Sequence, residues 1–322
     1  MDKIPVIAVL GPTASGKTEL AAELAKQYDS EVISCDSMQI YKGMDIATAK
    51  PTPDEMRGIK HHLISVIHRG KTFSVAQYTK LAKEAIDEIR AKDKTVILAG
   101  GTGLYAHALL DNLEFIDNSY SETIRKDLEQ RAAKQGMEPL IEELSRIDKR
   151  AALKLHPNNK VRIIRALEFY YSTGMTISQQ AEMSKKNPTP YNPCMIGLDF
   201  RDRQKLYDRI NQRVDLMISN GLADEVKEFA GEQALTSGQA IGYKELLPYL
   251  NGEITMDQAA DKIKMETRRY AKRQLTWFRK DKRIKFIYID EHEDFNSVLR
   301  AACKIIDESK ILGLGVSGVD AE

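Results

Sequence analysis

The segment "GPTASGKT", residues 11–18, constrains this chain more than any other stretch. It follows the apolar run "IPVIAVL" and precedes "ELAAELAKQY", so the pattern indicates a strand, a glycine-rich loop and a helix. The segment fits G-x-x-x-x-G-K-[ST], in which backbone N–H groups and a helix N-terminus bind phosphate, while the lysine and the hydroxyl serve the phosphates and Mg²⁺. We therefore predict phosphate binding here, with Lys17 and Thr18 as the strongest candidates.

Two further segments repeat the strand-then-helix pattern. "SEVISCDSMQ" and "KTVILAGGTGLY" are apolar strands, and the amphipathic stretch "SVAQYTKLAKEAIDEIRAKD" lies between them. This alternation predicts an α/β fold, a P-loop NTPase-like parallel sheet with helices on both faces. Ligands of such sheets collect beyond the carboxyl ends of the strands. Residues 11–18, Asp36 and the "GGTG" of residues 100–103 should therefore converge on one site.

The middle of the chain has a helical pattern with little strand signal, which predicts a mostly helical insertion domain over residues 117–193. "PTPYNPC" closes it as a stiff, proline-rich connector, and "MIGLDF" returns as a strand. The core would then consist of residues 1–116 and 194–311, with a disordered tail at 312–322.

Composition indicates the general class of protein and its expected location. Of 322 residues, 42% are hydrophobic and 30% charged, which suits a soluble globular protein with a substantial core. No apolar run approaches the roughly 20 residues that span a bilayer, and the N-terminus lacks the features of a signal peptide. The three cysteines are odd in number and far apart, which argues against disulfides or a zinc ribbon. We expect reduced cysteines, a cytoplasmic location and no membrane association.

A strongly basic segment lies near the C-terminus. Residues 268–283, "RRYAKRQLTWFRKDKR", hold eight Lys or Arg against one Asp, with aromatic residues interleaved. On a helix, two neighbouring rows of cations could follow a nucleic-acid backbone: Arg268, Lys272 and Arg279 in one, Arg269, Arg273 and Lys280 in the other. The alternative is a solvated helix that packs on the core through its apolar residues.

The remaining candidates have structural alternatives. Asp36 follows a strand, where it could act in catalysis or simply cap the next turn. Thr102 could be a turn residue among glycines. His61 and His62 lack a Cys or a third His at ligand spacing, so we expect packing and not a metal site.

Phosphate loops also occur in kinases and ATPases, where a strand ending in Asp holds Mg²⁺. "EVISCD" could supply that Asp, so a nucleotide or small-metabolite kinase is an alternative interpretation. The basic C-terminal segment is unexplained by it. A purely binding module is a third possibility, against which the intact Lys17 and Thr18 argue.

Several motifs together resemble one family. "GPTASGKT", "ISCDSMQIYKGMDIATAKP", "AGGTGLY", "LHPNNKVRIIRALE", "RINQRVDLMISNGLADEV", "QAIGYKE" and "RRYAKRQLTWFR" occur in this order over residues 11–279. The chain in this respect is similar to the tRNA dimethylallyltransferases, the tRNA isopentenyltransferases of bacteria. Their fold, a phosphate-loop core interrupted by a helical domain, agrees with the organisation above. The C-terminal zinc finger of eukaryotic members has no counterpart among the scattered cysteines.

The resemblance implies that the phosphate loop holds dimethylallyl diphosphate and does not use ATP. The acceptor would be N6 of adenosine 37 in the anticodon loop of tRNAs that read codons beginning with U. Mg²⁺ would sit on Thr18. The implied diphosphate-binding residues are Gly11, Pro12, Thr13, Ala14, Ser15, Gly16, Lys17 and Thr18, with Arg213 and Arg162 added by the family pattern.

For catalysis the resemblance implies Asp36 as proton acceptor, with Thr102 beside it and Lys17 on the diphosphate. Adenosine 37 would be flipped out of its stack to reach them. The helical insertion and the basic helix would grip the anticodon stem-loop, and we expect a monomer. The implied tRNA-binding residues are Asp36, Ser37, Met38, Gln39, Thr102, Arg125, Arg162, Arg165, Arg268, Arg269, Lys272, Arg273 and Arg279.

Overall fold

The structure is a computed structural model that describes residues 3–116, 121–184, 187–229 and 237–313. The chain forms two compact units, one from Met1–Leu110 with Pro190–Glu322 and the other from Asp111–Thr189. Most of the expected disordered tail, residues 314–322, lies outside the described residues. No helix among the described residues combines the length and apolar character needed to cross a membrane.

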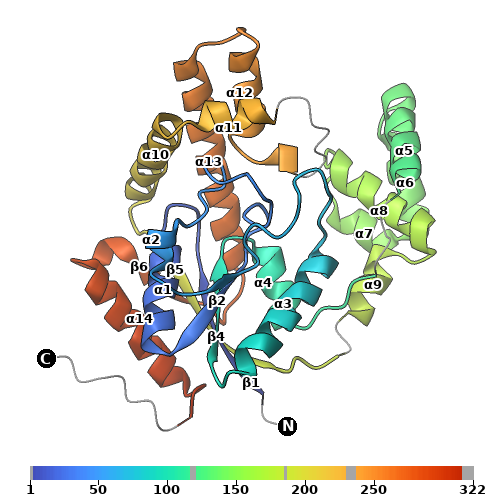
Figure 1. Ribbon diagram of the computed structural model, residues 1–322. Helices are drawn as coiled ribbons and strands as arrows, with labels where there is room; N and C mark the ends of the chain where they lie inside the picture. Colours follow the sequence, from blue (N-terminus) through green and yellow to red (C-terminus); the bar gives the residue numbers. More distant parts are fainter. Residues whose placement is uncertain (1–2, 117–120, 185–186, 230–236, 314–322) are drawn as a thin grey trace, which may run out of the picture. The chain divides into compact units, whose positions relative to one another are not determined.

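The first unit is built on a six-stranded sheet with the order β3-β2-β4-β1-β5-β6 (Figure 1). Every pairing is parallel. The predicted α/β class with a parallel sheet is therefore confirmed. The strands are β1 (Ile4–Leu10), β2 (Ser30–Ser34), β3 (His61–His62), β4 (Thr95–Gly100), β5 (Tyr191–Asp199) and β6 (Lys285–Tyr288).

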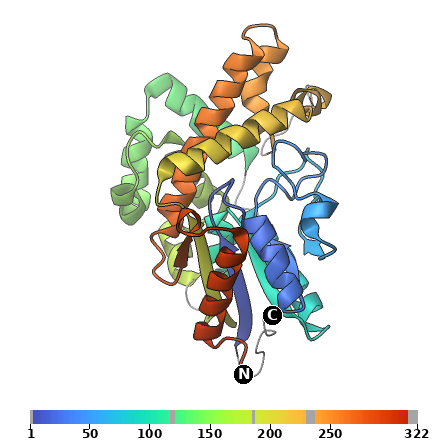
Figure 2. The same ribbon diagram turned by 90° about the vertical axis from the view of Figure 1, so that its left-hand side faces the viewer.

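Alternation along the strands produces two cores, because successive side chains point to opposite faces. In β1, Val6, Ala8 and Leu10 enter one core, whereas Ile7 and Val9 enter the other. Helices α3 (Val75–Arg90) and α4 (Gly103–Leu110) pack into the first core. Helices α1 (Lys17–Gln27) and α14 (Phe295–Ser309) pack into the second and lie side by side in Figure 2. Helices thus cover both faces, as predicted.

The remaining elements of this unit lie mainly beyond the carboxyl ends of the strands (Figure 1). Chief among them is α13, a helix of 23 residues that starts at a capping box on Thr255 and contains the first part of the basic segment. It ends at Phe278, so residues 280–283 of the basic segment follow the helix. The bounds are α2 (Pro53–Met56), α10 (Arg203–Ser219), α11 (Leu222–Glu228), η1 (Ser237–Gln239), α12 (Tyr243–Leu250), α13 (Met256–Phe278) and η2 (Ile289–Glu291).

The sequence analysis placed the start of one strand too late and missed two others. The segment predicted as a proline-rich connector contributes its last four residues to β5, which begins at Tyr191. Pro193 is tolerated because β6 pairs with β5 only from Ile196 onward, so this stretch has β1 as its one paired strand. The two short edge strands β3 and β6 were not predicted, since two and four residues are too few to show a period.

The second unit is helical within its described residues and has its own core. Leu128, Leu140, Leu144, Ile164 and Leu167 are buried together in it. Its helices are α5 (Glu122–Gln135), α6 (Glu138–Ile147), α7 (Lys149–Lys154), α8 (Lys160–Thr173) and α9 (Ile177–Met183).

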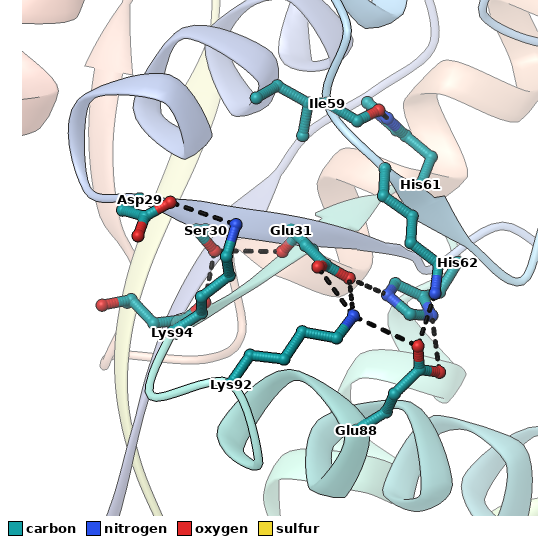
Figure 3. A network of polar contacts seen from close by, with 11 residues as sticks. Asp29, Ser30, Glu31, Ile59, His61, His62, Glu88, Lys92 and Lys94 are labelled. Atoms are coloured by element: carbon teal, nitrogen blue, oxygen red, sulfur yellow. Dashed lines mark hydrogen bonds and ion pairs between the residues drawn. The ribbon is translucent and has the colours of Figure 1, made fainter.

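A charged network joins the edge strand β3 to β2 and α3 (Figure 3). The Glu31 carboxylate is buried and lies 2.7 Å from His62 Nε2, while Lys92 Nζ donates to it at 2.9 Å. Glu88 accepts from Lys92 and Lys60. Burial alone would raise the pKa of Glu31, but the hydrogen bonds from Lys92 and His62 outweigh it and lower that pKa. The two lysines balance the two carboxylates. Glu31, His62 and Glu88 also offer potential ligand atoms within 4.8 Å of one another, so the expectation that His62 only packs stays a prediction.

Candidate active site

The phosphate loop has the tight backbone that its glycines predicted. Gly16 adopts a left-handed conformation, with φ of 77°, directly before α1 begins at Lys17. A Cβ at Gly11 would lie 2.8 Å from Ser15 Oγ and 3.1 Å from the carbonyl oxygen of Leu198, so a side chain there would displace the loop. Ser15 Oγ is itself buried without a hydrogen-bond partner among the described residues. The loop therefore holds a polar atom that a bound oxyanion would satisfy.

Two cations face the space beside this loop. Lys17 Nζ donates to the carbonyl oxygen of Pro12 at 3.1 Å. Burial, with a smaller effect of the Arg213 guanidinium, lowers the pKa of Lys17 to about 8 even though the Asp36 carboxylate opposes the shift. Burial also lowers the pKa of Arg213, and its Nε has no hydrogen-bond partner among the described residues. Two poorly solvated cations near one another favour an anionic ligand.

Asp36 caps the turn that follows β2 and also lies at the cavity wall, while its catalytic role stays a prediction. It follows β2, and its Oδ1 accepts from the backbone N–H groups of Met38 (2.9 Å) and Gln39 (3.4 Å), so it does cap the next turn. The same carboxylate lines the cavity beside Lys17 and Arg213. Capping by one oxygen holds the carboxylate in a fixed orientation at the cavity wall.

Thr102 connects the loops that follow β4 and β2. Its Oγ1 accepts from the backbone N–H of Ser37 at 3.0 Å, and its own N–H donates to the carbonyl oxygen of Cys35 at 3.1 Å. This approach requires glycine at position 100, where a Cβ would lie 2.1 Å from that carbonyl oxygen. The "GGTG" segment and the Asp36 turn are thus one packed structure.

Sequence reasoning missed Gln274, which ties two of the three loops together. From α13, its Oε1 accepts from the N–H of Thr13 at 3.0 Å, and its Nε2 donates to the carbonyl oxygen of Gly101 at 2.9 Å. Gln274 is buried. The only signal in the sequence is a neutral amide amid cations, in "KRQLTW". Tyr270, one turn earlier, was also missed, and its phenol lies beside Thr102.

The phosphate loop and the Asp36 turn line a cavity of about 250 Å³, whereas residues 100–103 are not part of its lining and instead pack against the Asp36 turn. The polar part of the cavity holds Thr13, Lys17, Thr18, Asp36, Arg213 and Arg273. Apolar side chains line another part, among them Met38, Ala47, Val214, Met217, Leu222 and Ile263, and Lys244 and Glu266 add further charged groups to the wall. Ser37, Gln39 and Tyr270 also lie on the wall. A charged end continuous with an apolar wall suits a ligand that carries a phosphate group on a hydrocarbon chain.

Several predicted tRNA-binding cations have partners within the protein. Arg268 donates to Asn211 Oδ1 at 2.6 Å and lies over the Tyr207 ring. Arg279 holds the buried Asp199 through two hydrogen bonds, of 3.1 and 2.7 Å. Arg269 pairs with Glu266. Three of the six cations therefore have partners from α10, β5 and α13 itself, and their predicted contacts with tRNA stay predictions.

The other cations of the basic segment are more available. Lys272, Arg273 and Lys280 are exposed. The apolar residues of the same helix pack as the structural alternative expects, since Ala271, Leu275 and Phe278 are buried. One face of the segment thus packs as the structural alternative expects, and binding of nucleic acid by the exposed cations stays a prediction.

Arg125, Arg162 and Arg165 belong to the helical unit. Arg125 and Arg165 both approach the fully buried carboxylate of Glu168, at 3.5 and 3.2 Å. Arg162 is exposed on α8, after the Asn159 cap. The first two are therefore structural in this unit, and the roles predicted for all three on tRNA or diphosphate stay predictions.

Comparison with known proteins places these features in one family. A family model described as IPP transferase matches residues 39–281. The tRNA dimethylallyltransferase of Acetivibrio thermocellus is 49% identical over 298 residues, which cover 92% of this chain and 95% of that protein. The same-named protein of Clostridioides difficile is 43% identical over 312 residues, covering 96% of this chain and 99% of that protein.

Solved structures agree. The tRNA isopentenylpyrophosphate transferase of Bacillus halodurans is similar with a TM-score of 0.70 and 42% identity, over 96% of this chain and 99% of that chain. A eukaryotic dimethylallyltransferase acting on tRNA is similar with a TM-score of 0.76 and 27% identity, over 95% of this chain and 80% of that chain. On sequence, fold and the layout of the phosphate-loop cavity, the chain belongs to the IPP transferase family.

Proposed function

We propose that this protein transfers the dimethylallyl group of dimethylallyl diphosphate to N6 of adenosine 37 in the anticodon loop of tRNAs that read codons beginning with U, releasing diphosphate. The observation that carries the proposal is the poorly solvated pair Lys17 and Arg213 next to Asp36, in a cavity whose other wall is apolar. Such a cavity suits a diphosphate, an allyl group and a proton acceptor at once. Relatives that are 43% and 49% identical to this chain are named tRNA dimethylallyltransferases.

The diphosphate end explains how the carbon–oxygen bond breaks. As the bond from the allylic carbon to oxygen cleaves, its electron pair leaves with the diphosphate and negative charge grows there. The N–H groups of the loop, Lys17 and Arg213 stabilise that charge, and they act strongly because the cavity is poorly hydrated. The apolar wall accommodates the allyl group, which carries the complementary positive charge.

We propose that Mg²⁺ is bound at Thr18, whose side chain lines the cavity next to Lys17. Hydroxyl, carboxylate and phosphate oxygens are the ligands that Mg²⁺ prefers, and the Thr18 hydroxyl would supply one of them beside a bound diphosphate. When bound, the ion would supply further positive charge for the departing diphosphate.

The nucleophile requires help, because the lone pair of N6 is delocalised into the adenine ring. We assign to Asp36 the acceptance of the N6 proton as the new C–N bond forms. Thr102 holds the Ser37 turn that carries this carboxylate, and the hydrogen bonds from Met38 and Gln39 keep it oriented. The flipped adenosine would enter beside them.

The exposed cations Lys272, Arg273 and Lys280 would contact the phosphates of the anticodon stem-loop, and the helical unit would hold its other side. We propose that the protein acts as a monomer. The proposed acceptor places the enzyme in the cytoplasm.

A transfer assay tests the proposal directly. The protein is incubated with labelled dimethylallyl diphosphate, Mg²⁺ and unmodified tRNA, with AMP and ATP in parallel reactions. We expect label in tRNA alone. Label in AMP would indicate a free-nucleotide transferase, and hydrolysis of ATP without transfer would indicate a kinase-like enzyme.

The lowered pKa of Lys17 predicts that activity is lost at alkaline pH. The protonated lysine binds diphosphate, so kcat/KM for dimethylallyl diphosphate should be constant below about pH 8 and fall as the pH rises through the pKa of the free enzyme. Lys17→Arg keeps its charge at every accessible pH and should lose this limb, at reduced overall rate. Lys17→Ala should abolish most turnover yet leave tRNA affinity unchanged. If kcat/KM of the Lys17→Arg variant fell at high pH as in the wild type, a group other than Lys17 would be responsible for the fall.

Asp36→Asn tests the proton acceptor. Asparagine retains an oxygen that accepts from Met38 and Gln39 but loses the basicity, so both substrates should bind normally while transfer falls roughly 10²-fold or more. A magnesium titration is the control. A defect that excess Mg²⁺ substantially restores would move Asp36 to the metal and contradict its role as base.

The double variant Lys272→Ala/Lys280→Ala should weaken tRNA binding and flatten the plot of log affinity against log salt by about one unit for each phosphate that is no longer neutralised. Lys304→Ala, an equally exposed lysine on α14, is the matched control and should change neither. The measurement is filter binding at several salt concentrations. A wild-type slope in the double variant would contradict binding of tRNA phosphates by these lysines.

A further inference from the structure

One carboxylate in the first unit collects an unusual number of hydrogen bonds. Glu225 Oε2 accepts from the backbone N–H groups of Asp45 (2.8 Å) and Ile46 (2.7 Å). Its Oε1 accepts from the N–H of Ala47 (3.0 Å) and from the hydroxyl of Tyr243 (3.1 Å). Three successive backbone donors therefore point at one side chain that lies 178 to 180 residues away in sequence.

The backbone segment held in this way, residues 45–49, is called the strap here. Ala47, Thr48 and Ala49 line the cavity. At its far end the strap is tied to the Asp36 turn, because Gln39 Nε2 donates to the carbonyl oxygens of Thr48 (3.4 Å) and Ala49 (3.2 Å). The strap therefore forms cavity wall between two anchors, Gln39 and Glu225.

Glu225 also connects the strap to the helix that carries the diphosphate clamp. It lies on α11, which follows α10 and its Arg213 through Gly221, a residue with φ of 91°. Leu222 of the same helix lines the cavity and is fully buried. A displacement of α11 would therefore move the strap and this wall together.

The surroundings of Glu225 keep it in place. Tyr243 stacks on Phe229, with ring centroids 5.9 Å apart, and the Arg69 guanidinium lies 3.3 Å from the centre of the Phe229 ring. Burial and the Glu225 carboxylate both raise the pKa of Tyr243, so its hydroxyl stays protonated and donates. Nothing in the proposed chemistry uses Glu225 directly, since it is absent from the lining of the cavity.

We infer that Glu225 is a positioning residue that latches the strap against the cavity and thereby sets the apolar site for the allyl group. This inference rests on the proposed function, in which the small apolar side chains of Ala47 and Ala49 face the hydrocarbon part of the substrate. The latch shapes a binding wall and contributes no charge to the reacting atoms. Its loss should therefore raise KM for dimethylallyl diphosphate and leave kcat nearly unchanged.

Glu225→Gln tests the latch with minimal change of shape. The amide has one acceptor oxygen and one NH₂ group, so in either orientation at least one strap N–H faces a donor. We expect KM for dimethylallyl diphosphate to rise roughly tenfold with kcat within about threefold of wild type. KM for tRNA should change less than about threefold, because phosphate contacts dominate its binding.

Two milder variants and one control accompany it. Tyr243→Phe removes a single hydrogen bond, and Glu225→Asp keeps the charge on a shorter side chain, so each should raise the same KM by a smaller factor. Glu228→Gln changes an exposed glutamate one turn away on α11 and should behave as wild type. The milder variants keep the test informative if Glu225→Gln does not fold.

Hydrogen exchange of peptides spanning residues 44–50 provides a readout independent of activity. Glu225→Gln should accelerate exchange of the strap amides, with the thermal midpoint of the protein little changed. Unchanged exchange would overturn the latch, and faster exchange with wild-type KM would overturn its positioning role. If the wild-type protein transferred no dimethylallyl group, the proposed function would fail, whereas the exchange measurement would still decide whether Glu225 holds the strap.

Discussion

Two positive charges, on Lys17 and Arg213, lie poorly solvated in the same cavity, and much of the surrounding structure serves to place them. Such a pair is unfavourable by itself, since burial lowers the pKa of both groups and each repels the other. A bound diphosphate would neutralise the two charges and remove this unfavourable free energy. The cation pair therefore favours binding of the anion. The Asp36 carboxylate offsets the repulsion in part, since it opposes the lowering of both pKa values, and it is the group proposed to accept the proton.

The long helix α13 has two functions in one element. Its buried side positions the loops, because Gln274 bonds to both Thr13 and Gly101. The fit is close: a Cβ at Gly103 would lie 2.1 Å from the Trp277 ring. Its exposed side carries Lys272 and Arg273, two of the cations proposed to contact tRNA. A rigid helix shared by both sites would fix the register between a bound anticodon loop and the reacting carbon, which is the positioning that a weak amine nucleophile needs.

The helices that follow β5 complete the cavity from the other part of the chain. Through α10 and α11 they deliver Arg213, Leu222 and Glu225 within 13 residues. The first belongs to the proposed diphosphate site, the second to the apolar wall, and the third to the latch on the strap. One continuous segment, α10 and α11, therefore contributes both a cation of the site and the residues that shape its wall.

The sequence by itself determined the class of fold and the place of the site. A phosphate loop between a strand and a helix, together with repeated strand-helix units, implies a parallel sheet whose carboxyl ends meet, and this placed residues 11–18, Asp36 and Thr102 together. Only the tertiary structure decided which polar side chains have hydrogen-bond partners within the protein. Arg268, Arg279 and His62 have partners that lie 57, 80 and 31 residues away. Gln274 and Glu225 bond to backbone groups still more remote in sequence, 173 and 180 residues away. Local periodicity reports which face of a helix is polar, but it contains no information about the hydrogen-bond partner that folding brings to that face.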